Sequence, residues 1–466
     1  MLRSLDLTNA DTIFRTGIAI LKSDAPETLL EGARIAVERH PRDPRMHQLL
    51  GLTARALGLS GLARDAFAKA ASLAPADPLI AHSHARAALE AGDTATDLFD
   101  GARQLAPMDG SLLLGRAAAQ IADGQFQAAI DDLAAIVEHN PLWLEGQRTL
   151  ARLRGQYGLD PAETILASLK NLSRNDLLHR EHIVIQLEAR NLDAADDAVR
   201  LAMKWLGEPA WLQQMAGHVA SERGAIETAD QLFEAVGGDD DIGLAAQRVR
   251  HLIRANRPDV AAALIDRWID RDADRLLWPY RALARRMLGD PRESGLEGDE
   301  AFVQIHDLAD MIGDLSSLAE YLRQLHMART APLDQSVRGG TQTDGNLLLR
   351  DDARIRHLRS VLLDAVKQYV DELPPPEPGH PLLIGKRRPI RIAGSWSVRL
   401  SGKGFHTDHV HSQGWISSAL YIALPHQDAE SAAAQEGWLS LGTARDLVPD
   451  LAPARLIEPR PGRLVL

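Results

Sequence analysis

Prolines punctuate the first third of this 466-residue chain at nearly constant intervals. Pro41, Pro75, Pro107 and Pro141 follow one another at spacings of 34, 32 and 34 residues. Between successive prolines lie two stretches whose apolar residues recur at helical spacing. Proline cannot continue a helix, so each one marks the turn into the next pair of helices. Such a repeat predicts a stack of helix pairs, in which each pair buries its apolar faces against its neighbours.

One repeat unit shows the pattern most clearly. Gly51 and Ala54 are small residues on its first helix, and Phe67 and Ala70 lie on its second helix, where the phenyl ring fills the space between units. The pattern resembles the tetratricopeptide repeat, a helix–turn–helix unit of about 34 residues. We assign residues 1–160 to such repeats and residues 161–330 to degenerate repeats of the same kind. The resemblance implies an extended surface that binds a protein or peptide partner.

Composition and charge exclude several classes of protein. The net charge of −12 and the isoelectric point of about 5.8 argue against nucleic acid or an anionic membrane as a partner. The chain contains no cysteine, which excludes disulfides, thiolate metal sites and cysteine nucleophiles. We find no pattern of a signal peptide and no apolar run of about 18 residues, so we expect a cytoplasmic protein without a membrane segment.

The character of the sequence changes near residue 330, where we place the start of a third domain, residues 331–466. Residues 351–373 have apolar residues at helical spacing, and Asp351 or Asp352 can cap that helix. From residue 390 to residue 400 apolar and polar residues alternate, which predicts a half-buried strand. We predict further strands within residues 415–424, 437–442 and 462–466. The chain is therefore expected to be a multidomain α plus β protein, an α-solenoid followed by a β domain.

Three histidines and one aspartate crowd into six residues of the β domain, as His406, Asp408, His409 and His411. On a regular strand, residues two apart face the same side, so His409 and His411 can share a metal ion, and so can His406 and Asp408. The two pairs have opposite parity, and only one should line a site unless a bulge reorients the chain. Spacing alone leaves this choice open, and it also allows a polar strand end without metal.

The order of features around the histidines resembles the 2-oxoglutarate/Fe(II)-dependent oxygenase domain found at the C-terminus of bacterial tetratricopeptide-repeat proteins. The matching positions are Trp396, Gly404, His409, His411, Ser417 and Tyr421, with a further similar segment at residues 335–343. The resemblance implies a double-stranded β-helix (jelly-roll), Fe(II) as the metal and 2-oxoglutarate as cosubstrate. It also favours His409 and His411 as the metal ligands and keeps His406 and Asp408 as the alternative pair.

Some parts of the implied site are missing from the sequence or uncertain. The family resemblance implies a distal histidine and a basic residue for 2-oxoglutarate, both after a strand like residues 459–466. We therefore expect the domain to be incomplete at Leu466, since His426 lies in a turn and is a poor third ligand. Arg338 is a candidate for binding the cosubstrate carboxylate, because arginine can contact a carboxylate at two points.

Other residues of the domain receive weaker assignments. Ser417 and Gln413 are candidates to orient the imidazoles, and Trp396 and Tyr421 are expected to fill the β core. No further catalytic residue is assigned.

Three functions compete at this point. The first is an oxygenase that hydroxylates a protein or peptide recruited by the repeats. The second is a non-catalytic repeat scaffold with a degenerate β domain. The third is a related barrel that holds zinc or manganese instead of iron.

Overall fold

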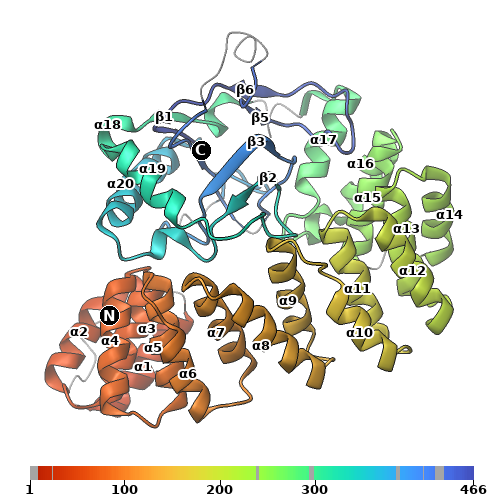
Figure 1. Ribbon diagram of the computed structural model, residues 1–466. Coiled ribbons are helices and arrows are strands. Elements are labelled where there is room, and N and C mark those ends of the chain that lie inside the picture. The colour runs from red at the N-terminus through yellow and green to blue at the C-terminus, as the bar shows by residue number, and fades with distance from the viewer. Residues whose placement is uncertain are drawn as a thin grey trace.

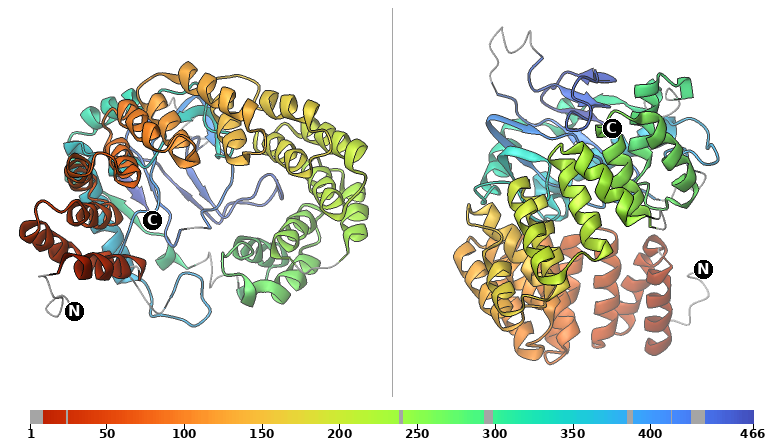
Figure 2. Two further views of the ribbon diagram at one scale, coloured as in Figure 1. Left: turned by 90° about the horizontal axis from the view of Figure 1, so that it is seen from below. Right: turned by 90° about the vertical axis from the view of Figure 1, so that its right-hand side faces the viewer.

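The computed structural model describes residues 9–23, 25–237, 241–292, 299–384, 389–412, 414–425 and 435–466. Helices α1 to α17 form an arc, and the remaining helices and the strands lie along one edge of it (Figure 1). Seen from below, in the left view of Figure 2, the arc curves around the C-terminal strands. The molecule is therefore a helical solenoid with a small C-terminal β region. No helix within the described ranges is long and apolar enough to cross a membrane.

The solenoid consists of antiparallel helices joined by short turns. Its helices are α1 (Ala10–Lys22), α2 (Leu30–Arg39), α3 (Pro44–Ala56), α4 (Ser60–Leu73), α5 (Pro78–Ala91), α6 (Thr96–Leu105), α7 (Gly110–Ala122), α8 (Phe126–His139), α9 (Leu144–Gln156), α10 (Glu163–Asn171), α11 (Asp176–Glu188), α12 (Leu192–Leu206), α13 (Ala210–Glu222), α14 (Ile226–Val236), α15 (Ile242–Arg254), α16 (Pro258–Trp268) and α17 (Trp278–Leu288).

The repeated sequence signals act as helix caps. Asp43 and Asp77 accept backbone N–H bonds at the starts of α3 and α5, and a proline follows each at the first helical position. That proline has no N–H to leave unsatisfied, and its φ suits a helix. At the far ends, Gly58 and Gly92 adopt positive φ values of 66° and 89°, which side-chain-bearing residues rarely adopt. The predicted helix pairs are confirmed.

Close packing between the helices depends on the small residues seen in the sequence. Phe67 is fully buried, and a Cβ on Gly51 would lie 2.8 Å from its ring. Phe99 is the equivalent residue of the next repeat, and a Cβ on Gly115, in the first helix of the repeat that follows, would lie 2.3 Å from its ring. Each buried phenyl ring contributes roughly 1.5–3 kcal/mol of hydrophobic free energy, so these contacts fix the stacking of the repeats.

The described part of the C-terminal region has short strands and α-helices. Its helices are α18 (Ala309–Ile312), α19 (Leu315–Gln324) and α20 (Ala353–Glu372), and its strands are β1 (Ile305–Asp307), β2 (Val337–Gln342), β3 (Val398–His406), β4 (Ala419–Leu420), β5 (Leu439–Leu441), β6 (Arg455–Ile457) and β7 (Arg463–Val465). The described strands pair antiparallel as β1–β7–β4, β2–β3 and β5–β6. These are three small sheets, and the expected jelly-roll stays a prediction.

Two strand predictions need correction. The strand expected from residue 390 begins at Val398, because Ser395 and Ser397 bond to the loop at residues 343–348 instead of to a neighbouring strand. Ser395 O accepts from Leu347 N at 2.8 Å, and Ser397 O accepts from Thr343 N at 3.0 Å. Within residues 415–424, only β4 pairs with another strand. The helix expected at residues 351–373 is α20, with Asp352 as its cap.

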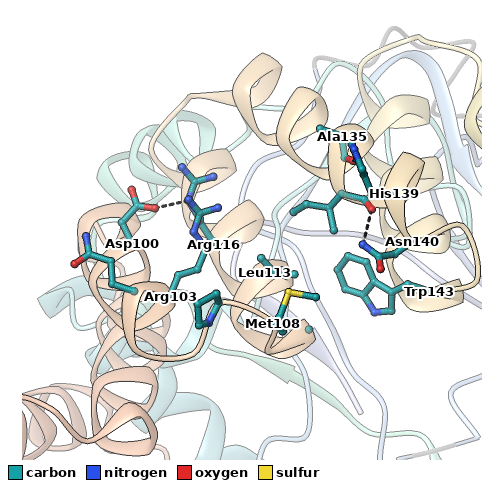
Figure 3. A pocket seen from close by; sticks show the side chains of 13 residues that line it. Asp100, Arg103, Met108, Leu113, Arg116, Ala135, His139, Asn140 and Trp143 are labelled. Atoms are coloured by element: carbon teal, nitrogen blue, oxygen red, sulfur yellow. Dashed lines mark hydrogen bonds and ion pairs between the residues drawn. The ribbon is translucent and has the colours of Figure 1, made fainter.

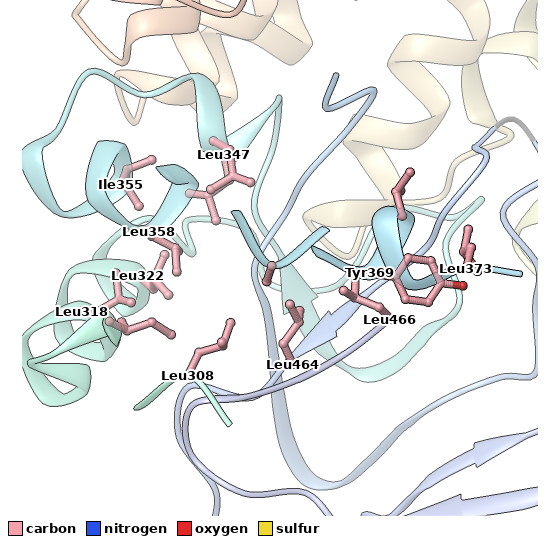
Figure 4. Packing of buried hydrophobic residues seen from close by; sticks show 14 of the residues in the cluster. Leu308, Leu318, Leu322, Leu347, Ile355, Leu358, Tyr369, Leu373, Leu464 and Leu466 are labelled. Atoms are coloured by element: carbon pink, nitrogen blue, oxygen red, sulfur yellow. The ribbon is translucent and has the colours of Figure 1, made fainter. Parts of the chain in front are cut away.

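The C-terminal region has its own apolar core, in which β7 packs against α18–α20 (Figure 4). Leu464 is fully buried there, and Tyr369 donates its hydroxyl to Phe302 O at 2.9 Å. Burial raises the pKa of Tyr369 to about 12. Because β1 pairs with β7, residues ahead of 331 take part in this region. The divisions at residues 160 and 330 stay predictions.

The C-terminal region docks on the ends of the first helices of successive repeats. Arg359 donates to Leu57 O at 2.9 Å and to Gly58 O at 2.5 Å, both at the end of α3. Asp351 N donates to Ala91 O at 2.7 Å, at the end of α5. Carbonyls at a helix C-terminus have no partner within the helix and carry partial negative charge, so they suit an arginine.

Candidate metal centre

The histidine cluster follows β3, which pairs antiparallel with β2, and glycines let these two strands approach closely. A Cβ on Gly404 would lie 2.2 Å from Gly339 O, and Gly339 has a positive φ of 68°. The register places His406, the last residue of β3, opposite Val337, which is buried. Residues 407–411 are not part of a strand. The parity argument from the sequence therefore does not apply beyond His406.

His409 and His411 converge without a regular strand. Their Nε2 atoms lie 3.2 Å apart, and the ring planes are nearly perpendicular, at 87°. His409 Nδ1 lies 2.8 Å from Thr407 O. Because a carbonyl can only accept, Nδ1 of His409 is the donor in this contact. In a neutral ring this leaves the lone pair on Nε2, and that atom lies within hydrogen-bond distance of His411 Nε2. This is the arrangement in which metal-binding histidines are usually held, with the second nitrogen bonded to a fixed acceptor.

The spacing of the two nitrogens fits a shared metal ion. At a metal–nitrogen distance of about 2.1 Å, two ligand atoms lie about 3.0 Å apart at a right angle and about 3.4 Å apart at a tetrahedral angle. The observed 3.2 Å falls between these values. Two imidazole donors therefore fit two adjacent positions around one cation, in either an octahedral or a tetrahedral arrangement.

His411 lies beside an aromatic ring, and its surroundings favour the neutral imidazole. Its ring centroid is 5.6 Å from that of Trp396, which is 40% exposed. The expectation that Trp396 fills the core is wrong, since its side chain is exposed. Partial burial and the neighbouring His409 lower the pKa of His411. A neutral imidazole is the form that binds a metal.

The alternative metal pair, His406 and Asp408, makes contacts with other protein groups instead of converging on one point. His406 Nδ1 contacts Ser336 Oγ at 3.0 Å, and its ring stacks at 6.0 Å from that of His409. Asp408 accepts from Arg445 Nε at 3.1 Å and Nη2 at 2.5 Å. Burial acts to raise the pKa of Asp408, but the hydrogen bonds from Arg445 outweigh it and lower that pKa. Both carboxylate oxygens are thus engaged by protein groups.

Arg445, which binds Asp408, lies in a segment that packs against the solenoid. In this segment, residues 442–452, the side chains of Leu447 and Val448 pack against apolar side chains of α15–α17. Asp446 forms an ion pair with Arg250 of α15, and Arg286 of α17 donates to Ala452 O at 2.6 Å. The loop that carries His409 is therefore tied, through Asp408, to the last helices of the arc.

Arg338 lies at another junction with the solenoid. It is half-buried and lines a cavity of about 310 Å³ together with Glu188, Ser401 and the glycines of β2. Its Nη1 donates to Gln335 O at 2.6 Å and to Val337 O at 2.8 Å. Burial, with a smaller effect from Arg190, lowers the pKa of Arg338. Its role toward a cosubstrate stays a prediction.

A third metal ligand is not provided by the part of the chain that the structure describes. Within those ranges, no group of three or more His, Asp or Glu side chains is placed to hold one ion. His426 and Gln413 lie outside the described residues. The sequence reasoning missed Thr407 O and Arg445, and it named Ser417 in their place. A backbone carbonyl and a contact 37 residues away leave no local signal in a sequence.

The arrangement defines a helical-repeat protein whose C-terminal β region carries a pair of convergent histidines. Residues 394–466 match the family model described as "Putative 2OG-Fe(II) oxygenase". This match confirms the predicted resemblance for the segment that contains both histidines. The search of curated proteins found no match.

Several solved structures are similar to the chain over part of its length. One is a tetratricopeptide repeat protein from Parabacteroides merdae, 18% identical, with 50% of this chain and 95% of that chain covered and a TM-score of 0.31. Another is PilW, a type IV pilus biogenesis factor, 14% identical, with 49% and 91% covered and a TM-score of 0.29.

Proposed function

We propose that this protein is a non-heme iron, 2-oxoglutarate-dependent oxygenase that hydroxylates a protein or peptide recruited by its helical repeats. The observation that carries the proposal is the 3.2 Å approach of His409 Nε2 to His411 Nε2. The family match over residues 394–466 supports iron as the metal and 2-oxoglutarate as the cosubstrate. When bound together, the iron and 2-oxoglutarate would activate O2, which is the oxidant for the hydroxylation, and 2-oxoglutarate would be oxidised to succinate and CO2.

The residues of this chain have separate roles in the proposal. His409 and His411 hold the metal, and Thr407 O keeps His409 in the correct tautomer. Arg338, on β2, binds a carboxylate of the cosubstrate beside the β2–β3 pair. Trp396, exposed beside His411, forms an apolar wall next to the metal. We place the protein in the cytoplasm.

The test is anaerobic titration of the full chain with Fe(II), in the presence and absence of 2-oxoglutarate, followed by admission of O2. We expect saturable iron binding, a new absorption band when 2-oxoglutarate is added, and succinate formation that requires O2. The His409→Ala and His411→Ala variants should lose all three. If either variant binds iron as tightly as the wild type, the assignment of the pair is wrong.

A non-catalytic scaffold is the second candidate, and one observation favours it. Within the described ranges, two imidazoles converge but no third ligand joins them. This function predicts weak or no iron binding together with retained partner binding by the repeats. Metal analysis of the purified protein separates both candidates from a third one, a zinc or manganese protein.

A further inference from the structure

The solenoid has a free edge opposite the C-terminal region. The turns after α3, α5 and α9 face residues 327–359, so the turns that begin α5, α7, α9 and α11 lie on the opposite edge (Figure 1). Large apolar side chains are exposed along it, at Leu79, Met108, Leu142 and Leu177. Met108 is the most exposed of them, at 81%. Single exposed apolar residues are ordinary on a folded protein, and Met108 differs from the others in that it borders a groove.

A groove opens in the middle of this edge, between α6 and α8, with α7 beneath it (Figure 3). Its volume is about 1000 Å³, which is enough for several side chains. Pro107 and Met108 form one wall, Ile136 and Trp143 form the other, and Leu113 lies between them. The groove lies between the second helices of two consecutive repeats.

The groove contains one arginine whose hydrogen-bond donors are not used by the described residues of the protein. Arg103 lines it and forms no hydrogen bond or ion pair within the described part of the chain. Arg116, at one end, is paired with Asp100 and Asp132. The nearby carboxylate of Asp109 is used to cap α7, where it accepts from Ser111 N at 2.9 Å. Asp132 interacts with Arg103 electrostatically but makes no hydrogen bond to it, so the guanidinium of Arg103 can still donate to an anionic group that lies next to the apolar side chains.

We propose that this groove binds an amphipathic segment of a partner protein, with apolar side chains between Met108 and Trp143 and a carboxylate paired with Arg103. The inference rests on the proposed function, because it identifies the surface by which the repeats would recruit their partner. Methionine suits this role, since its flexible side chain adapts to different apolar shapes. Arginine suits it because its guanidinium binds a carboxylate at two points.

The test is selection of short random peptides displayed on phage, using the full chain as bait without iron or 2-oxoglutarate. The Met108→Glu variant serves as competitor, so that only ligands of the groove are enriched. The matched control is Met311→Glu, which places the same substitution at another exposed methionine, 56% exposed, on α18. Sedimentation velocity of each variant shows whether it associates with itself.

We expect enriched peptides that combine apolar residues with Asp or Glu. They should bind Met108→Glu and Arg103→Glu about tenfold more weakly than the wild type, and Met311→Glu as well as the wild type. Changing the acidic residue of the peptide to Lys should restore binding to Arg103→Glu.

Three results would overturn the proposal: no enrichment, enrichment of basic peptides, or a dimer of the wild type that Met108→Glu dissociates. The last would make a second copy of the chain the occupant. Because iron and 2-oxoglutarate are absent, these results are independent of whether the histidine pair binds a metal.

Discussion

Arg445 holds Asp408, the residue directly before His409, by a two-point ion pair and a backbone hydrogen bond. The side-chain distances are 2.5 and 3.1 Å, and Arg445 N donates to Asp408 Oδ2 at 2.7 Å. The Asp408 side chain is only 11% exposed, so the pair is partly shielded from water. A carboxylate that looked like a metal ligand in the sequence instead anchors the loop that carries the histidine pair.

Replacing Arg445 by Ala should therefore weaken metal binding without removing a ligand. We expect the metal affinity to fall by about tenfold, because groups that position the ligands usually affect affinity by 10–100-fold. The measurement is Co(II) titration followed by absorbance. Arg460→Ala is the matched control, since it removes an arginine from an exposed pair with Glu458, 2.5 Å long. Equal affinities for the two variants would show that the Arg445 contact does not position the site.

The two candidate metal pairs can be separated by single substitutions. We expect His411→Ala to abolish Co(II) binding. We expect His406→Ala to change the Co(II) affinity by less than about threefold, which is a smaller free-energy change than the 1.4 kcal/mol of a tenfold effect. The reason is that Nε2 of His411 faces Nε2 of His409, whereas His406 Nδ1 contacts Ser336. Isothermal titration calorimetry measures both affinities. Loss of binding in His406→Ala, with retention in His411→Ala, would favour the pair His406 and Asp408.

The stacking of the repeats can be tested with the same substitution at two glycines. Gly51→Ala puts a Cβ 2.8 Å from the buried ring of Phe67, and we expect it to lower the free energy of unfolding by about 1–3 kcal/mol. Gly101→Ala, on α6, meets no atom within 4 Å and should raise it by about 0.5–1 kcal/mol. Thermal and urea unfolding measure the difference. A destabilised Gly101→Ala would contradict this packing.

The burial of His182 leads us to predict that the protein loses stability on mild acidification. It is buried in α11, its Nδ1 has no hydrogen-bond partner among the described residues, and burial lowers its pKa to about 4. The unfolded chain, with a pKa of about 6.5, takes up the proton first as the pH falls. The contribution of neutral His182 to the free energy of unfolding, up to about 3 kcal/mol, is therefore fully present above about pH 6.5 and is lost as the pH falls toward about 4.

Unfolding measured across that pH range, for the wild type and for His182→Leu, tests this expectation. The variant should show a smaller loss of stability between pH 6.5 and pH 4 than the wild type. His357→Leu, at an exposed histidine, should keep the pH dependence of the wild type. If His182→Leu and the wild type lose stability in parallel, His182 is not the group that responds.

The repeats could be predicted in detail because their signals are local. Asp43 caps a helix that begins one residue later, and Gly58 ends that helix within the same unit. Phe67 on α4 and Gly51 on α3 lie on the two helices of one pair, and they meet because a short turn joins these helices. The β region was harder, because its pairing joins distant residues. Val337 pairs with His406 across the intervening helix α20, and β1 pairs with the last strand.

By itself, the sequence determined the helix pairs, the change of character near residue 330 and the histidine cluster, since each depends on residues close together in the chain. The tertiary structure decided how the cluster is arranged. It showed that residues 407–411 leave the strand, so that Thr407 O orients His409 toward His411. It also placed Arg445 on Asp408, because packing of residues 442–452 on α15–α17 brings together side chains that no periodicity relates.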